Sequence, residues 1–270
     1  MAMTQSVRRH LVSVLWRGAI AVILLFLLAP IIVIVIGSFS NVAYVVFPPT
    51  GFSVRWYVAY FTSREFLEST LLSARLGAMV MVISSVIGVM TALALSAMRQ
   101  PVMEVMRAVL VAPLVVPGIV VGIAMLFYFF GIGMGNTFAS LIIAHVVLTL
   151  PFVVLIVLAA LESLDRSLEE AAMGLGAGRI RTVLTITLPL IKGNVFAAGI
   201  FAFIISFDEL VVTLFLASPR QTTLPVRIYQ YIEFTSDPSI AAVSTLLIVV
   251  TTIAVLLVER YLGFARRVLR

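Results

Sequence analysis

Long apolar runs separated by short polar segments set the pattern of this 270-residue chain. A helix that crosses the roughly 30 Å hydrocarbon core of a bilayer needs about 20 mostly apolar residues, and six such runs can be placed. The predicted spans are residues 18–37, 70–98, 108–130, 138–161, 193–218 and 238–258. A glycine-rich turn at 131–137 separates the third from the fourth, where no Asp, Glu, Lys or Arg interrupts the sequence. The pattern predicts an all-α, polytopic membrane protein with six transmembrane helices in one domain, residues 1–270.

Composition supports a membrane protein and excludes several other classes. Hydrophobic residues make up 62% of the chain, charged residues only 11%, and the mean hydropathy is +1.20. A soluble domain carries about 25% charged residues. The chain has no cysteine, which excludes disulfides, thiolate nucleophiles and cysteine metal sites. The net charge of +6 does not indicate nucleic-acid binding, because the basic residues flank the apolar runs instead of sharing one face.

The basic residues also predict the orientation. Short cytoplasmic loops are enriched in Lys and Arg. With both termini in the cytoplasm, thirteen basic residues lie inside: Arg8, Arg9, Arg17, Arg99, Arg107, Arg166, Arg179, Arg181, Lys192, Arg260, Arg266, Arg267 and Arg270. Four lie outside: Arg55, Arg64, Arg220 and Arg227. The first span is too long for the core of a cleaved signal peptide, so we expect it to be retained.

The loop at 162–189, predicted to be cytoplasmic, reads as two short amphipathic helices around a bend. Apolar residues recur at helical spacing through its first half. They are Leu161, Leu164, Leu168, Ala171, Ala172 and Leu175. Gly174, Gly176 and Gly178 follow, and glycine allows a sharp bend because it tolerates positive φ. A second amphipathic stretch, 179–188, ends at Pro189, where we expect the chain to re-enter the membrane.

The spacing of this loop resembles the signature motif of ABC-importer permeases, the EAA motif. The matching positions are Glu170, Ala171, Ala172, Gly176, Ile186, Leu188 and Pro189. The resemblance implies a type I importer permease in the bacterial inner membrane, whose loop contacts a separate ATPase subunit. It further implies a second, related permease chain, two ATPase subunits and an external solute-binding protein as partners.

The glycines of this loop do not indicate a nucleotide site on the chain itself. A phosphate-binding loop of the Walker type ends in Gly-Lys-Ser/Thr, and a dinucleotide site follows a strand. Gly174 to Arg179 satisfies neither condition. We therefore expect no cofactor and no enzymatic activity here, with ATP and magnesium held by the partner ATPase.

Two carboxylates interrupt the fifth predicted span. Inserting a charged side chain at the centre of a membrane helix costs about 2.5–3.5 kcal/mol of free energy, so Asp208 and Glu209 are functional candidates. Adjacent helical residues point about 100° apart, so we expect one to face the pathway and the other a neighbouring helix. Arg75 lies at a similar predicted depth and is the candidate counter-ion. A pair of Arg75 with one carboxylate could serve only to join two helices, or a carboxylate could line the translocation pathway; both interpretations stay open. His145 is expected to be a satisfied packing residue.

The sequence around these carboxylates resembles the permeases of spermidine/putrescine importers. The similar segments are 206–216, 223–229, 238–245 and 51–57. The resemblance implies that the solute is a polyamine, and two outer-half carboxylates suit a multivalent cation. Permeases for opines, amino-acid derivatives and ferric iron share much of the pattern and remain alternatives.

Aromatic residues gather in the two segments predicted to lie outside, 41–66 and 219–237. They are Trp56, Tyr57, Tyr60, Tyr229, Tyr231 and Phe234. Such residues form an interfacial belt in membrane proteins, and the resemblance adds a platform for the solute-binding protein. Both interpretations stay open.

Two other classes of function fit less well. An ion-coupled secondary transporter would use Asp208 and Glu209 as ion sites, but the first half shows no clear repeat of this segment. That reading also leaves the EAA-like loop unexplained. An intramembrane enzyme needs a nucleophile beside a base, and no spacing indicates such a pair.

Overall fold

The computed structural model describes residues 5–44, 46–219, 221–235 and 237–262, without the side chains of 5–12 and 257–262. Apart from two isolated β-bridges, its named elements are helices, which confirms the all-α class. Several basic residues used for the orientation lie outside this description: Arg220, Arg266, Arg267 and Arg270, with the side chains of Arg8, Arg9 and Arg260. The orientation of the termini stays a prediction.

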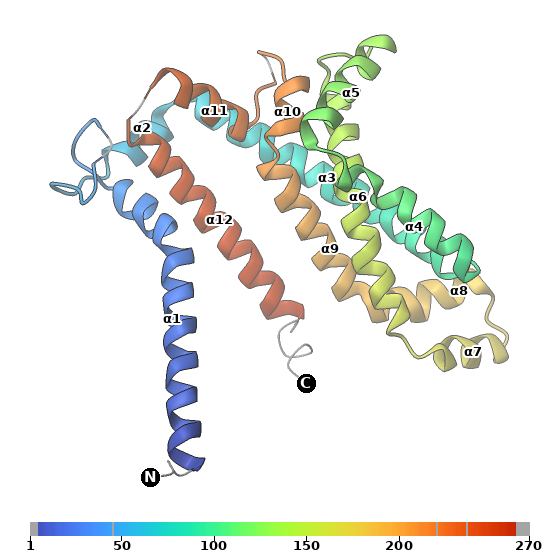
Figure 1. Ribbon diagram of the computed structural model, residues 1–270. Helices are drawn as coiled ribbons and strands as arrows, with labels where there is room; N and C mark the ends of the chain where they lie inside the picture. The colour runs from blue at the N-terminus through green and yellow to red at the C-terminus, as the bar shows by residue number, and fades with distance from the viewer. Residues whose placement is uncertain (1–4, 45, 220, 236, 263–270) are drawn as a thin grey trace. The chain divides into compact units, whose positions relative to one another are not determined.

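Five helices account for most of the apolar sequence (Figure 1). They are α1 (Gln5–Gly37), α3 (Arg64–Ser96), α6 (Phe138–Glu162), α9 (Leu188–Asp208) and α12 (Ser239–Leu262). The shorter ones are α2 (Arg55–Thr62), α4 (Gln100–Val115), α5 (Gly118–Gly131), α7 (Arg166–Gly174), α8 (Arg179–Thr182), α10 (Val211–Leu216) and α11 (Leu224–Phe234). A π-helical turn, η1 (Val183–Thr187), joins α8 to α9.

Within the described residues, five helical stretches are long and apolar enough to cross a membrane. A sixth is obtained if α4 and α5 count as one span, although they meet at an angle of 98°. The six predicted runs therefore correspond to five continuous helices and one bent pair.

The third predicted span, 108–130, is the bent pair, and this corrects the expectation of one continuous helix. Val116, which has β-region dihedrals (φ −76°, ψ 133°), and Pro117 separate α4 from α5. Proline disfavours the α conformation in the residue before it and has no amide hydrogen to give to the preceding turn. The helix therefore ends at Val115 and restarts in a new direction at Gly118.

The fifth predicted span, 193–218, differs at both ends. A continuous helical stretch runs from Arg179 to Asp208, straight through Pro189, where the sequence predicts a break. The π-turn η1 lies immediately before Pro189, and the amide of Leu188 donates to Val183 O, five residues back. A widened turn relieves the clash that a proline ring makes with the preceding turn. At the other end, Glu209 and Leu210 separate α9 from α10.

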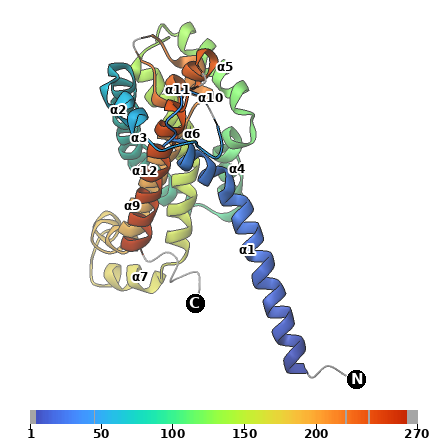
Figure 2. The same cartoon turned by 90° about the vertical axis from the view of Figure 1, so that its left-hand side faces the viewer.

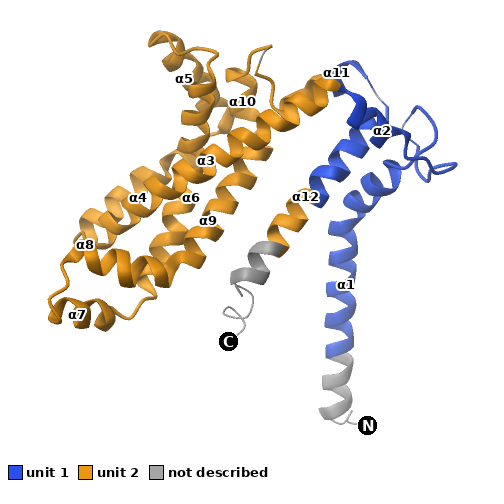
Figure 3. Ribbon diagram, turned by 180° about the vertical axis from the view of Figure 1, so that it is seen from behind, with its two compact units in different colours: residues 1–63, 231–249 blue, residues 64–230, 250–270 orange. Residues whose placement is uncertain are grey.

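The chain forms two compact units (Figure 3), and the predicted single permease domain stays a prediction. Unit 1 comprises Met1–Ser63 and Tyr231–Val249. In it, Tyr57 OH lies 2.6 Å from Ser38 Oγ, and Trp56 Nε1 donates to Ser40 O at 2.8 Å. These two aromatic residues therefore hold α2 against the segment that follows α1.

Unit 2 comprises Arg64–Gln230 and Val250–Arg270, and its core lies between α3, α6 and α9. Small residues allow these helices to approach closely, as in other membrane helix bundles. A Cβ atom on Gly88 of α3 would lie 2.5 Å from Val153 Cγ1 of α6. One on Gly199 of α9 would lie 2.7 Å from Ser85 Oγ of α3. Figures 1 and 2 show α7 at one end of this unit, with α5 and α10 at the other.

Candidate functional site

Two places in unit 2 carry the functional candidates: the α7–α8 loop and the break between α9 and α10. The loop begins with a capped helix. The Oδ1 atom of Asp165 accepts a hydrogen bond from the Ser167 amide at 2.9 Å and caps α7. This bond lowers the pKa of the Asp165 carboxyl below its ordinary value. The cap is therefore intact at neutral pH, and its contribution is lost as the pH falls through that lowered pKa.

The bend predicted at Gly176 is present, and it has a defined geometry. Gly176 has φ +91°, whereas neither Gly174 nor Gly178 has a positive φ. The Gly176 amide donates to Met173 O at 3.0 Å, and the Ala177 amide donates to Ala172 O at 3.1 Å. These two bonds form a Schellman motif, which requires the left-handed residue at this position. One glycine of the three therefore makes the bend.

After the bend, a side chain whose role the sequence does not indicate joins the chain back to α7. Thr187 is fully buried at the end of η1, and its Oγ1 donates to Glu169 Oε1 at 2.5 Å. Glu170, the motif residue, is exposed. No local sequence pattern indicates this pair, because Glu169 and Thr187 are 18 residues apart in sequence. Glu169 fixes α7 to the long helix and leaves Glu170 facing outward.

The predicted apolar stripe of the loop divides into a packed part and an exposed part. Leu161 and Leu164 pack against the core between α3, α6 and α9. Leu175 is 91% exposed, and Ile180 in α8 is 78% exposed. These two apolar side chains are therefore uncovered at the tip of the loop.

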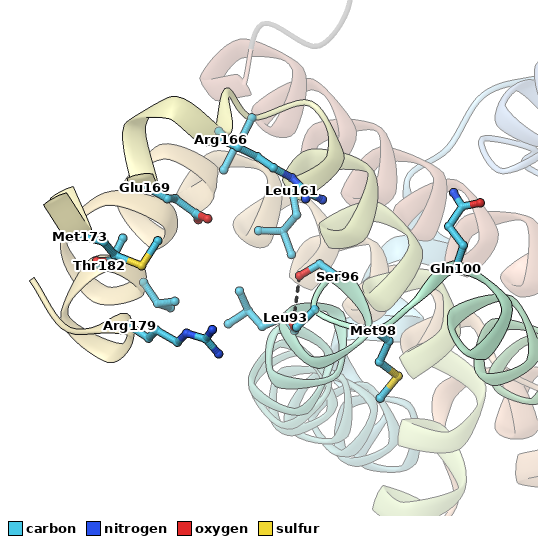
Figure 4. Close-up of a pocket in the computed structure, with 13 residues that line it drawn as sticks. Leu93, Ser96, Met98, Gln100, Leu161, Arg166, Glu169, Met173, Arg179 and Thr182 are labelled. Atoms are coloured by element: carbon cyan, nitrogen blue, oxygen red, sulfur yellow. Dashed lines mark hydrogen bonds between the residues drawn. The ribbon is translucent and has the colours of Figure 1, made fainter. Parts of the chain in front are cut away.

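A pocket of about 630 Å³ lies under the loop, beside the end of α3 (Figure 4). Its lining combines apolar residues with two arginines and a glutamate. They include Leu93, Leu161, Arg166, Glu169, Met173 and Arg179. Glu169, the residue that holds Thr187, therefore also lines this pocket.

At the α9–α10 break the two carboxylates have different surroundings. Glu209 Oε1 accepts the Val212 amide at 2.9 Å, so Glu209 caps the start of α10. Asp208 ends α9 and is exposed; no hydrogen bond or ion pair of the described residues engages its carboxylate. The expectation that one carboxylate faces the pathway and the other a neighbouring helix stays a prediction.

Arg75, the predicted counter-ion, does not pair with either carboxylate in this structure. Its Cζ lies 5.1 Å from the centroid of the Phe138 ring, a cation–π contact. The salt bridges among the described residues involve other groups: Arg64 with Glu68, and Arg227 with Glu65. Glu209 is turned toward the α10 amides instead.

His145 is a satisfied buried residue, as the sequence predicts. It is fully buried in α6, with Nδ1 2.8 Å from Ser206 Oγ and Nε2 2.9 Å from Thr213 Oγ1. Ser206 belongs to α9 and Thr213 to α10, so the imidazole bridges the break. The sequence did not indicate this bridging position.

The described residues form five or six apolar helical spans and an exposed helix–glycine–helix loop, which is the architecture of a polytopic membrane protein. Residues 84–268 match the family described as "Binding-protein-dependent transport system inner membrane component". The chain belongs to this family and is a multi-pass inner-membrane permease subunit of an ABC importer.

Two proteins of similar sequence are named as permeases of polyamine transport systems. The chain is 29% identical over 239 residues to the spermidine/putrescine transport system permease protein PotC of Escherichia coli (strain K12), covering 88% of this chain and 90% of PotC. It is 30% identical over 243 residues to the putrescine transport system permease protein PotI of the same strain, covering 86% and 85%.

A solved structure shares the fold. It is a bacterial ABC transporter involved in the import of the acidic polysaccharide alginate, with a TM-score of 0.75 and 17% identity. The match covers 97% of this chain and 99% of that one. At this identity the likeness shows the fold alone.

Replacing Gly176 with alanine tests the bend. A left-handed conformation costs a residue with a Cβ atom about 1–2 kcal/mol, so Gly176→Ala should destabilise the end of α7. We expect amide hydrogen exchange of 166–174 to accelerate by roughly 5- to 30-fold in the purified protein, measured by mass spectrometry.

Gly174→Ala is the matched control. Gly174 is helical, and a Cβ atom there meets nothing within 4 Å. Alanine is the better helix former, so exchange should slow. Equal exchange in the two variants would contradict the assignment of the bend to Gly176.

Proposed function

We propose that this chain forms half of the translocation pore of a polyamine importer, for a solute such as spermidine or putrescine. A solute-binding protein delivers the solute on the outside, and a second, related permease supplies the other half of the pore. The observation that carries the proposal is the exposed carboxylate of Asp208 at the interrupted fifth span. The similarity to polyamine permeases over most of the chain supports the choice of solute.

The electrostatics of the break favour a cation. A helix carries partial negative charge at its C-terminus, and Asp208 is the last residue of α9. The opposite charge at the start of α10 is offset by the Glu209 carboxylate, which accepts from the Val212 amide. The carboxylate left to meet a solute is therefore that of Asp208, and both it and the end of α9 attract positive charge.

The exposed face of the loop is the proposed contact with the ATPase subunits, which hold ATP and magnesium. The proposed contact includes the exposed motif positions Glu170, Ala171, Gly176 and Pro189; Ala172, Ile186 and Leu188 are half-buried, and Leu188 packs against the core between α3, α6 and α9. Its uncovered apolar side chains, Leu175 and Ile180 above all, support an interface there. The chain itself takes no part in hydrolysis in this proposal.

A continuous helix supports mechanical coupling between the two sites. The stretch Arg179–Asp208 has 30 residues, which corresponds to about 45 Å at 1.5 Å per residue. Thr187, which bonds to Glu169, lies eight residues after Arg179, and Asp208 is the last residue of the stretch. Movement of the loop by the ATPase subunits would then move the solute site without an intervening hinge.

Asp208→Asn tests the proposed pathway residue. It removes the charge at nearly constant size, so we expect uptake of radiolabelled spermidine or putrescine to fall by about tenfold or more, which corresponds to a loss of about 1.4 kcal/mol. The measurement is the initial uptake rate in cells or vesicles that carry the complete transporter.

Glu209→Gln is its matched comparison. Glutamine keeps a side-chain oxygen that can accept the Val212 amide, so most uptake should remain. A larger loss for Glu209→Gln than for Asp208→Asn would reverse the roles given to the two residues. Native transport of other solutes, but of neither polyamine, would exclude the proposed cargo.

Thr187→Val tests the coupling. It keeps the shape of the side chain and removes the bond to Glu169; hydrogen bonds to charged groups contribute about 1.5–3 kcal/mol. We expect solute imported per ATP hydrolysed to fall by about tenfold in proteoliposomes, because α7 then moves independently of the long helix.

Thr185→Val provides the control for this measurement. Thr185 is exposed, and its hydroxyl donates only to Arg181 O within its own helix. Transport per ATP should change little. If both variants lowered the ratio equally, the Glu169–Thr187 bond would have no special role in coupling.

A further inference from the structure

His145 occupies a position that its role as a packing residue does not explain. It stands on α6, the continuous fourth span, and its ring contacts α9 on one side of the helix break and α10 on the other. The bond to Thr213 is the side-chain hydrogen bond that joins α10 to a full-length helix within the described residues. Because its two ring nitrogens contact different sides of the break, the imidazole can fix α10 relative to α9.

The hydrogen atoms of this network can be assigned by counting. Thr213 Oγ1 donates its one hydrogen to the carbonyl oxygen of Glu209 at 2.9 Å, so toward His145 it can only accept. Nε2 of His145 must therefore carry a hydrogen. In the neutral tautomer with its hydrogen on Nε2, Nδ1 accepts from Ser206 Oγ.

The backbone of His145 also takes part in a hydrogen-bonded chain. Thr149 Oγ1 donates to the carbonyl oxygen of His145 at 2.8 Å, and it lies 2.8 Å from Ser84 Oγ of α3. Because the hydrogen of Thr149 is already used, Ser84 is the donor to Thr149. Through Thr149, Ser84 of α3 is therefore linked to the backbone carbonyl of His145, whose ring contacts both sides of the break.

α10 needs such an anchor. It has six residues, too few for a helix that is stable alone. It packs on α5, where a Cβ atom on Gly122 would lie 2.6 Å from Phe215 Cδ2. Yet α5 is also a half-helix, beyond the 98° bend. Apolar contacts with α3 and α6 also hold the pair, and the bond from His145 to Thr213 adds a side-chain hydrogen bond between α6 and α10.

We propose that His145 is a positioning residue for transport: its Nε2–H group anchors Thr213 and, through it, the carbonyl group of Glu209, and so fixes the break that presents Asp208. This inference rests on the proposed function in one respect, the assignment of Asp208 to the solute pathway. The anchoring of α10 stands on the geometry alone.

Two substitutions of His145 distinguish the roles of its two ring nitrogens. Glutamine places an amide N–H near the position of Nε2, and it can keep the bond to Thr213. Asparagine reaches only as far as the position of Nδ1, so it can keep the bond to Ser206 but loses Thr213. A structural role in packing would not favour the longer amide over the shorter one.

The first measurement reports on α10 without any transport. Because the chain has no cysteine, Leu214→Cys gives a unique spin-labelling position in this subunit, on a residue that is 38% exposed. Electron paramagnetic resonance spectra are recorded on the assembled transporter, with partner subunits whose own cysteines have been replaced.

With His145, and with His145→Gln, we expect an immobilised spectrum. His145→Asn and Thr213→Val should add a mobile component, and Ser206→Ala should not. A His145→Asn spectrum identical to the native one, or equal mobility in His145→Gln and His145→Asn, would overturn the anchoring role. Immunoblots of membranes verify that each variant is inserted in equal amounts.

The second measurement tests the link to Asp208 by a double-mutant cycle on spermidine uptake. His145→Asn should lower the initial rate by about tenfold in the native background and by less than about twofold in Asp208→Asn. Equal losses in both backgrounds would overturn the link. If Asp208→Asn alone transports normally, the proposed pathway fails, while the spectra still decide the anchoring role.

Discussion

Every backbone amide and carbonyl group in the hydrocarbon of a membrane must find a partner within the protein, because no water is available there. This constraint decides where the chain can interrupt a helix. At the break after Asp208, the Glu209 carboxylate accepts from the Val212 amide, and the Thr213 hydroxyl donates to the Glu209 carbonyl. With these groups bonded, the chain can leave helical geometry between α9 and α10 and place the Asp208 carboxylate at the end of α9. The solute site proposed here depends on that arrangement.

The same constraint explains how the two ends of unit 2 can act together. Between the loop and the break, the helix from Arg179 to Asp208 has no interruption, because the π-turn at Val183–Thr187 absorbs Pro189. Glu169 joins α7 to this helix at one end, and His145 holds the short helix α10 beyond the other. The result is a continuous helical connection between the loop that we propose contacts an ATPase subunit and the carboxylate that we propose meets a cation.

Much of this architecture could be predicted from the sequence, because apolar runs and the EAA-like spacing are local signals. The bend at Gly176 follows from a glycine at one motif position. The effect of each proline does not follow from the sequence in the same way. Pro117 ends a helix, Pro151 lies within one, and Pro189 follows a widened turn. Whether a proline ends a helix depends on whether the helical turn before it can widen to accommodate the ring. The pair of Glu169 with Thr187, and the separate roles of Asp208 and Glu209, depend on contacts formed only in the folded chain.

The central claim is that this permease subunit passes polyamines through the membrane when partner subunits hydrolyse ATP. The most direct test is accumulation of radiolabelled spermidine and putrescine in proteoliposomes that contain the complete transporter and its solute-binding protein. We predict accumulation that requires ATP and persists when ion gradients are collapsed. Accumulation driven by an ion gradient without ATP, or ATP-dependent transport that accepts neither polyamine, would contradict the account.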